Sequence, residues 1–267
     1  MANDGDEELL TFGGHLEVLR RMLFRIIALV GLIAVVAFCF KDATWRILLA
    51  PSEYQFVTYR WIEQAVQAFG VDFSFNPFHV DLIATDLSSQ FVTHIKTSLY
   101  IGLLGASPYV VYELFRFISP ALYEHEKRYS VRVVVIIYFL FLLGVLMSYF
   151  VLFPISFRFL GTYSVADRIH STITLDSYVS TFTTLTLLMG VVFQLPVIAF
   201  VLAKMGFVTA DLLARYRKHA FLLILLLAAI ITPPDLMTLV LVSIPLYLLY
   251  EVSIRVVRWV GTPKVKS

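Results

Sequence analysis

No charged residue interrupts the stretch Ser177–Ala203, SYVSTFTTLTLLMGVVFQLPVIAFVLA. An α-helix rises about 1.5 Å per residue and bilayer hydrocarbon is about 30 Å thick, so roughly 20 apolar residues cross a membrane. This stretch is long enough to do so. Three other apolar stretches of similar length precede it: Met22–Phe40, Thr97–Phe115 and Val133–Phe157. The sequence therefore predicts an integral membrane protein that crosses the bilayer several times.

Two further apolar runs, Ala220–Ile231 and Leu236–Ile254, follow near the C-terminus. Only four residues, Thr232–Asp235, separate them, and so short a connection predicts an antiparallel helical hairpin. The first run is too short for an untilted crossing of standard hydrocarbon. Either neighbouring helices cover its end or the bilayer thins beside it. We therefore predict an all-α fold of six transmembrane helices, of which the last two are short and form a tight hairpin.

The composition supports a single membrane domain. Hydrophobic residues make up 59% of the 267 residues and charged residues 15%, and the mean hydropathy is +0.83. Soluble domains carry about 25% charged residues, so we expect one integral domain over 1–267. With a cytoplasmic N-terminus, 15 of the 21 Lys and Arg residues would lie inside and 6 outside. Because cytoplasmic loops are rich in Lys and Arg, this distribution predicts an N-in, C-in topology.

Two segments outside the predicted spans have a distinct character. We expect residues 1–21 to form a cytoplasmic N-terminal segment, because their acidic beginning is unlike a cleavable signal peptide. The longest polar connection is the outer loop 41–95, in which apolar residues recur at helical spacing before Gly70. This pattern predicts an amphipathic helix over the outer face that ends at the glycine. The apolar residues of that helix are Phe56, Tyr59, Ile62, Val66 and Phe69.

Motifs for catalysis and metal binding are missing from the sequence. His125–Arg128 begins like the helix of a zinc protease, but Tyr129 stands where the second His is required. The chain has no Gly-x-Ser-x-Gly elbow, no P-loop and only one cysteine, Cys39. We therefore expect no enzyme, no cofactor, no metal site and no nucleic-acid partner.

The inner connection 107–128 is dense in charged and aromatic residues. Pro108 lies in an apolar helix and should kink it and free a carbonyl, and Pro120 should stop the next helical turn. Glu124 and Glu126 lie in the resulting elbow, where a carboxylate can accept a guanidinium in bidentate geometry. The elbow could therefore bind an arginine-bearing peptide.

A simpler interpretation of these carboxylates is local pairing on one helix face. Glu124 would pair with Arg128 at i, i+4, and Glu113 with Arg116 at i, i+3. Composition alone favours this local pairing over peptide binding.

Residues 108–126 have the pattern Pro-x-x-x-Tyr-x-x-x-x-Phe-x-x-Pro-Ala-Leu-Tyr-x-x-Glu. Four more motifs are His15–Arg20 (HLEVLR), Ala84–Asp86, Phe193–Val197, and Thr232–Asp235 followed by Ile244-Pro245 and Tyr250-Glu251. Together they resemble TatC, the multispanning core of the twin-arginine protein translocase. The resemblance covers nearly the whole chain, and five motifs in order are far more specific than one.

The resemblance implies a receptor in the cytoplasmic (inner) membrane for folded precursors that carry an Arg-Arg signal peptide. It would work with single-span TatA/TatB-type proteins and other copies of itself, using the protonmotive force. Carried over by position, Glu126 is the carboxylate expected to bind the signal's guanidinium, which favours the peptide-binding interpretation of the elbow. The same patch is expected to contain Phe117, Pro120, Leu122, Tyr123, Arg20 and Glu17.

The resemblance further implies that partner helices dock on the fourth to sixth spans, at Thr232, Asp235 and Leu239. Four prolines are expected to kink or shape the helices. They are Pro108, Pro196, Pro233 and Pro234.

Four features depart from the family pattern. Gln194 replaces Glu about 15 Å from the inner boundary of the fourth span, so we expect a membrane-embedded amide that meets a polar partner across helices and has no titratable proton. In the N-terminal motif, Val18 stands at the position where the family has Glu, and Glu17 lies one residue earlier. The residue that would make a second contact to the Arg pair is therefore unassigned. Leu239 stands where Gln is frequent. The outer loop 52–78 is longer than the family leads us to expect.

A small-solute secondary transporter is the alternative class, with Gln194 and Glu113 as a polar path. The absence of charge from the third and fourth spans and the lack of visible internal repeats argue against it.

Overall fold

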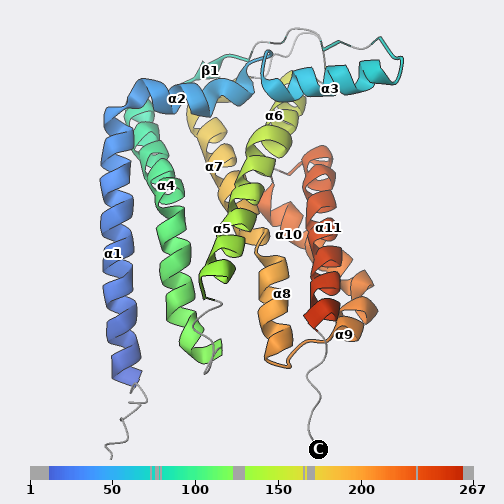
Figure 1. The fold of residues 1–267 in the computed structure, drawn as a ribbon. Coiled ribbons are helices and arrows are strands. Elements are labelled where there is room, and N and C mark those ends of the chain that lie inside the picture. The colour runs from blue at the N-terminus through green and yellow to red at the C-terminus, as the bar shows by residue number, and fades with distance from the viewer. Residues whose placement is uncertain are drawn as a thin grey trace, which may run out of the picture.

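The computed structural model describes residues 12–72, 74–75, 78, 80–122, 130–164, 166, 172–232 and 234–260. Long helices run side by side, and α2 and α3 lie across their ends on one side (Figure 1). The described chain begins in α1 and ends in α11 on the opposite side (Figure 1). The elements are α1 (Phe12–Cys39), α2 (Lys41–Leu49), η1 (Ala50–Ser52), α3 (Val57–Ala68), β1 (Leu82–Ile83), α4 (Ser89–Leu122), α5 (Ser130–Met147), η2 (Ser148–Leu152), α6 (Phe153–Thr162), β2 (Ile173–Thr174), α7 (Leu175–Val192), α8 (Leu195–Lys204), α9 (Ala210–Arg215), α10 (Arg217–Ile231) and α11 (Leu236–Val260).

Four helical segments of this part of the chain are long and apolar enough to cross a membrane. They are Leu16–Cys39, Val133–Thr162, Leu175–Lys204 and Leu236–Trp259. The two remaining predicted spans lie in α4 and α10. α4 has 34 residues but includes Lys96, Glu113 and Arg116, and α10 has only 15 residues.

Proline explains why two of the long segments are divided. Pro154 lacks a backbone N–H, and the π-helical turn η2 ends just before it, between α5 and α6. Pro196 likewise cannot donate to Val192, the residue at which α7 ends, and it occupies the first turn of α8. The break between α7 and α8 is therefore at the position expected for Pro196.

α4 runs unbroken past both of its prolines. The Leu104 carbonyl, which Pro108 deprives of its usual donor, accepts a hydrogen bond from the Ser107 hydroxyl at 2.6 Å. The prediction that Pro120 stops the helix is wrong, because α4 ends at Leu122. A proline removes only one backbone hydrogen bond and its φ is helical, so it is tolerated near the end of this helix.

The C-terminal hairpin forms as predicted, with α10 packed against α11 across a short turn. The prediction that both helices are short is confirmed for α10 and wrong for α11, which has 25 residues. α11 continues beyond Ile254 because Arg255 and Arg258 end the apolar run without disfavouring a helix. At its start, the Asp235 carboxylate accepts a hydrogen bond from the Thr238 backbone N–H at 2.6 Å and caps the helix.

The buried core lies where α7, η2, α6 and α11 meet. Its most enclosed side chains are Leu152, Phe153, Leu185, Met189, Val242 and Leu246. α1 lies outside this core and packs mainly on α4. Much of its remaining surface is exposed and apolar, as at Ile27, Leu32 and Val35, which suits a helix that faces lipid.

The layer across the ends of the long helices contains the predicted amphipathic helix, α3, and also a helix that sequence patterns did not indicate, α2 (Figure 1). Gly70 ends the α3 segment with a φ of +79°, a left-handed conformation that glycine adopts readily. Tyr59 is the buried anchor of α3, and its hydroxyl donates to the Pro154 carbonyl at 2.9 Å. Burial raises the pKa of Tyr59, because the surroundings solvate a phenolate poorly. Thr58 donates to the Phe150 carbonyl beside it.

An arginine from α6 organises the chain that follows α3. The Arg158 guanidinium lies 4.0 Å from the ring centroid of Phe75, 4.7 Å from that of Phe78 and 5.4 Å from that of Tyr59. The Phe75 backbone N–H donates to Glu63 at 2.7 Å. Cation–π contacts therefore hold part of the loop that follows α3 on the helical bundle.

Candidate functional site

Packing of α1 against α4 brings a buried carboxylate and an arginine together. Glu113 on α4 is only 5% exposed. The Tyr109 hydroxyl donates to Glu113 Oε1 at 2.7 Å, and Arg25 Nη1 on α1 lies 3.6 Å from the same oxygen. A charge in such surroundings is stabilised only by its partners. Sequence patterns paired Glu113 with Arg116 and did not identify Arg25.

Close packing of the two helices produces this pairing. A Cβ added at Gly102 of α4 would lie 2.6 Å from the Val30 carbonyl oxygen and 2.9 Å from the Ala34 Cβ, both on α1. Small residues allow membrane helices to approach this closely. Gly102 is visible in the sequence, but the residues of α1 that it faces are not, so the pairing of Arg25 with Glu113 could not be predicted.

The predicted signal-peptide residues are partly described. Phe117 is half-buried and lies one helical turn after Glu113 on α4. The Arg20 guanidinium lies 5.8 Å from the Phe24 ring centroid. Glu17 accepts a hydrogen bond from Arg21 at 2.7 Å on the exposed surface of α1.

The remaining predicted residues of this patch lie at or beyond the end of α4. Pro120 and Leu122 belong to its last turn, where the structure describes only the backbone. Tyr123 and Glu126 lie outside the described residues, as do Glu124 and Arg128 of the local-pairing interpretation.

Gln194 lies at the break between α7 and α8. Its amide nitrogen donates to the Ile137 carbonyl of α5 at 3.2 Å and to the Gly190 carbonyl at 3.3 Å. This is the cross-helix contact that the sequence predicts. Gln194 and Glu113, which the transporter alternative places on one path, contact different helices: α5 and α7 for Gln194, and α1 and α4 for Glu113.

The three predicted docking residues all have contacts within the hairpin. The Thr232 hydroxyl donates to the Ala228 carbonyl at 2.9 Å, Asp235 caps α11, and Leu239 packs against the core. Pro234 is exposed, and Pro233 lies outside the described residues. The apolar surface at the start of α11 comes instead from residues that the sequence did not single out, namely Leu236, Met237 and Val240.

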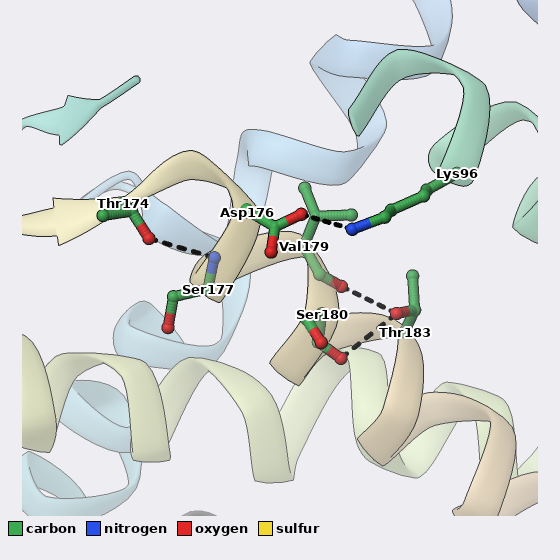
Figure 2. A network of polar contacts seen from close by, with 7 residues as sticks. All are labelled: Lys96, Thr174, Asp176, Ser177, Val179, Ser180 and Thr183. Carbon is green, nitrogen blue, oxygen red and sulfur yellow. Dashed lines mark hydrogen bonds and ion pairs between the residues drawn. The ribbon is translucent and has the colours of Figure 1, made fainter. Parts of the chain in front are cut away.

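A polar network ties the N-terminal parts of α4 and α7 together (Figure 2). Lys96 Nζ lies 2.7 Å from Asp176 Oδ1. The Thr174 hydroxyl accepts a hydrogen bond from the Ser177 backbone N–H at 3.2 Å and caps α7. Deeper in α7, the Thr183 hydroxyl bonds the helix's own carbonyls. An ion pair, a helix cap and intrahelical hydrogen bonds of this kind fix the positions of α4 and α7 and do not form a reactive site.

The part of the chain that the structure describes contains no group of three or more His, Cys, Asp or Glu residues that could hold a metal ion. Its four long apolar helical segments define the class, a polytopic α-helical membrane protein.

Comparisons with known proteins identify the family. The family model described as "Sec-independent protein translocase protein (TatC)" matches residues 14–245. The chain therefore belongs to the TatC family, a family of protein translocase components. It is 36% identical to the TatC protein of Desulforapulum autotrophicum over 97% of this chain and 88% of the relative. It is 38% identical to that of Aquifex aeolicus over 66% and 73%.

The fold is also similar to a solved structure of the family. The crystal structure of a twin-arginine translocase receptor, TatC, matches with a TM-score of 0.72 at 32% sequence identity. The match covers 92% of this chain and 99% of that chain. Similarity over nearly the full length of both chains shows that this chain has the TatC fold.

Proposed function

We propose that this chain is the receptor and core subunit of a twin-arginine translocase, which binds Arg-Arg signal peptides and exports folded proteins. The observation that carries the proposal is the end-to-end match, at 32% identity, to a protein described as a twin-arginine translocase receptor. The order of the five motifs along the chain supports the same function.

The proposed topology has six crossings in the cytoplasmic membrane with both ends inside. The crossings are α1, α4, α5 with α6, α7 with α8, α10 and α11. The start of α1 and the end of α11 lie on one side of the bundle, opposite α2 and α3 (Figure 1). The excess of Lys and Arg in the segments at that side supports its cytoplasmic location.

The signal peptide binds at the inner ends of α1 and α4. Glu126 accepts the guanidinium, and Phe117, Pro120, Leu122, Tyr123, Arg20 and Glu17 surround it. Charge-assisted hydrogen bonds of this kind contribute about 1.5–3 kcal/mol each before ordering costs. An acidic site on a surface that is otherwise basic favours an arginine pair over most peptides.

Single-span TatA/TatB-type proteins and further copies of this chain complete the translocase, which the protonmotive force drives. The exposed Leu236, Met237 and Val240 beside Thr232 provide an apolar surface for a partner helix. Gln194 cannot titrate, so proton coupling does not pass through this side chain.

Export of an Arg-Arg precursor tests the proposal. Glu126→Gln should abolish export, because the amide loses the charge that pairs with the guanidinium. Glu53 is an exposed carboxylate that the proposed topology places on the outer side. Glu53→Gln is therefore the matched control, and this variant should export the precursor normally. Wild-type export by the Glu126→Gln variant would overturn the assignment.

A further inference from the structure

Glu113 is the one Asp, Glu, Lys or Arg residue among the buried residues that the structure describes. Its two described contacts, from Tyr109 and Arg25, both reach Oε1. The Arg25 side chain is 56% exposed, whereas that of Glu113 is 6% exposed. The pair therefore joins a fixed, buried acceptor to a donor that is free to move into solvent.

The Arg25–Glu113 contact is looser than an arginine–carboxylate pair elsewhere in the same chain. Arg217 binds Glu251 with two hydrogen bonds, of 2.7 and 2.9 Å. The single Arg25 contact of 3.6 Å exceeds the usual range for an N–H···O hydrogen bond. Arg25 thus balances the buried charge without forming the bidentate geometry in which a guanidinium binds most strongly.

The acceptor borders the proposed signal-peptide site. Glu113 and Phe117 are separated by four residues on α4 and so share a helix face. On α1, Arg25 lies just over one turn beyond Arg20. Glu17, the acidic residue of the N-terminal motif, is already bonded to Arg21.

We propose that Glu113 is a second guanidinium acceptor for the signal peptide, and that Arg25 occupies it in the free receptor. This inference rests on the proposed function. An arginine of the signal peptide displaces Arg25, and the Arg25 side chain moves into solvent. The incoming guanidinium then binds the Glu113 carboxylate more closely than Arg25 does. The exchange leaves no buried charge unpaired, so it avoids the penalty for an isolated carboxylate. A second acceptor also explains how a receptor can require two arginines.

Binding of a labelled Arg-Arg signal peptide to the purified full-length chain in lipid nanodiscs tests this exchange. Glu113→Gln should weaken binding about 10- to 100-fold, the equivalent of one charge-assisted hydrogen bond. Arg25→Gln should tighten binding several-fold, because the internal competitor is removed. A Lys-Lys peptide should bind weakly to all three proteins. Arg25→Gln binding no more tightly than wild type would overturn the proposal.

A charge-swapped double variant, Arg25→Glu with Glu113→Arg, separates exchange from a purely structural pair. A structural pair predicts that the swap restores wild-type binding, whereas exchange predicts that binding stays weak. Thermal unfolding of each variant in nanodiscs reports whether it folds. If Glu113→Gln does not fold, the tighter binding expected of Arg25→Gln and the weak binding of the swap remain the tests.

Two further measurements distinguish this inference from the proposed function. Wild-type protein that binds Arg-Arg and Lys-Lys peptides equally, or Glu126→Gln protein that binds normally, refutes the proposed function itself. If the preference for Arg-Arg over Lys-Lys peptides depends on Glu126 but is unaffected by Glu113→Gln and Arg25→Gln, only the second acceptor is refuted.

Discussion

Gly102 should be the position at which a single added methyl group most directly separates α1 from α4. Its Cβ would lie 2.6 Å from the Val30 carbonyl oxygen, 2.9 Å from the Ala34 Cβ and 3.0 Å from the Ala34 backbone nitrogen. Two of these atoms belong to the backbone and cannot rotate away. Gly102→Ala must therefore move one helix relative to the other.

The magnitude follows from two opposing effects. Overpacking of a close contact costs about 1–3 kcal/mol, while alanine favours a helix over glycine by up to about 1 kcal/mol. Gly31→Ala on α1 is the matched control, because nothing lies within 4 Å of the Cβ that it would add. The control experiences only the second effect. Gly102→Ala should therefore be less stable than Gly31→Ala by about 1–3 kcal/mol.

Reversible unfolding in mixed detergent micelles measures this difference for the two variants and the wild type. The same displacement should alter the Arg25–Glu113 contact, so signal-peptide affinity should change in Gly102→Ala and not in Gly31→Ala. Equal unfolding free energies for the two variants would refute the close approach of α1 and α4.

Three further variants test other contacts. Gln194→Leu removes one cross-helix hydrogen bond, to the Ile137 carbonyl, and one to the Gly190 carbonyl four residues earlier. It should lower the unfolding free energy by about 0.5–1.5 kcal/mol without stopping export; lost export at unchanged stability would contradict this. Arg158→Met should speed amide hydrogen exchange at Phe75, because the cation that holds its ring is gone; unchanged exchange would show that the contact is dispensable. Asp176→Asn should cost less than about 1 kcal/mol, because its pair with Lys96 is half exposed, and the cost should disappear in about 1 M salt. A cost that persists in salt would indicate a different role.

Elements that depend on local pattern were predictable from the sequence. The long apolar segments appear as helices, and α3 ends at Ala68, two residues before Gly70, where the spacing of apolar residues stops. Pro196 coincides with the break between α7 and α8. In each case a property of neighbouring residues decides the structure.

Predictions failed where a helix tolerated residues that were expected to end it, and where contacts joined residues far apart in the sequence. Pro120 removes only one hydrogen bond, so α4 continues to Leu122. The predicted last span ended where the apolar run meets arginine, but arginine is compatible with a helix and α11 continues through it. The Arg25–Glu113 pair depends on the register of two helices far apart in sequence. Local periodicity carries no information about that register.

The contacts of Arg158 were unpredictable for a similar reason. Its aromatic partners come from a loop with no regular spacing and lie on a different part of the chain. The length of that loop was visible in the sequence, but its attachment to α6 depends on the tertiary fold.

The most direct test of signal-peptide recognition introduces a photoreactive amino acid at position 117, in place of Phe117, in the full-length chain. Illumination with a radiolabelled folded precursor should give a crosslink when the signal carries Arg-Arg. The crosslink should be lost when the signal carries Lys-Lys or when the receptor carries Glu126→Gln. Crosslinks of equal strength in all three reactions would contradict recognition of the arginine pair at the inner ends of α1 and α4.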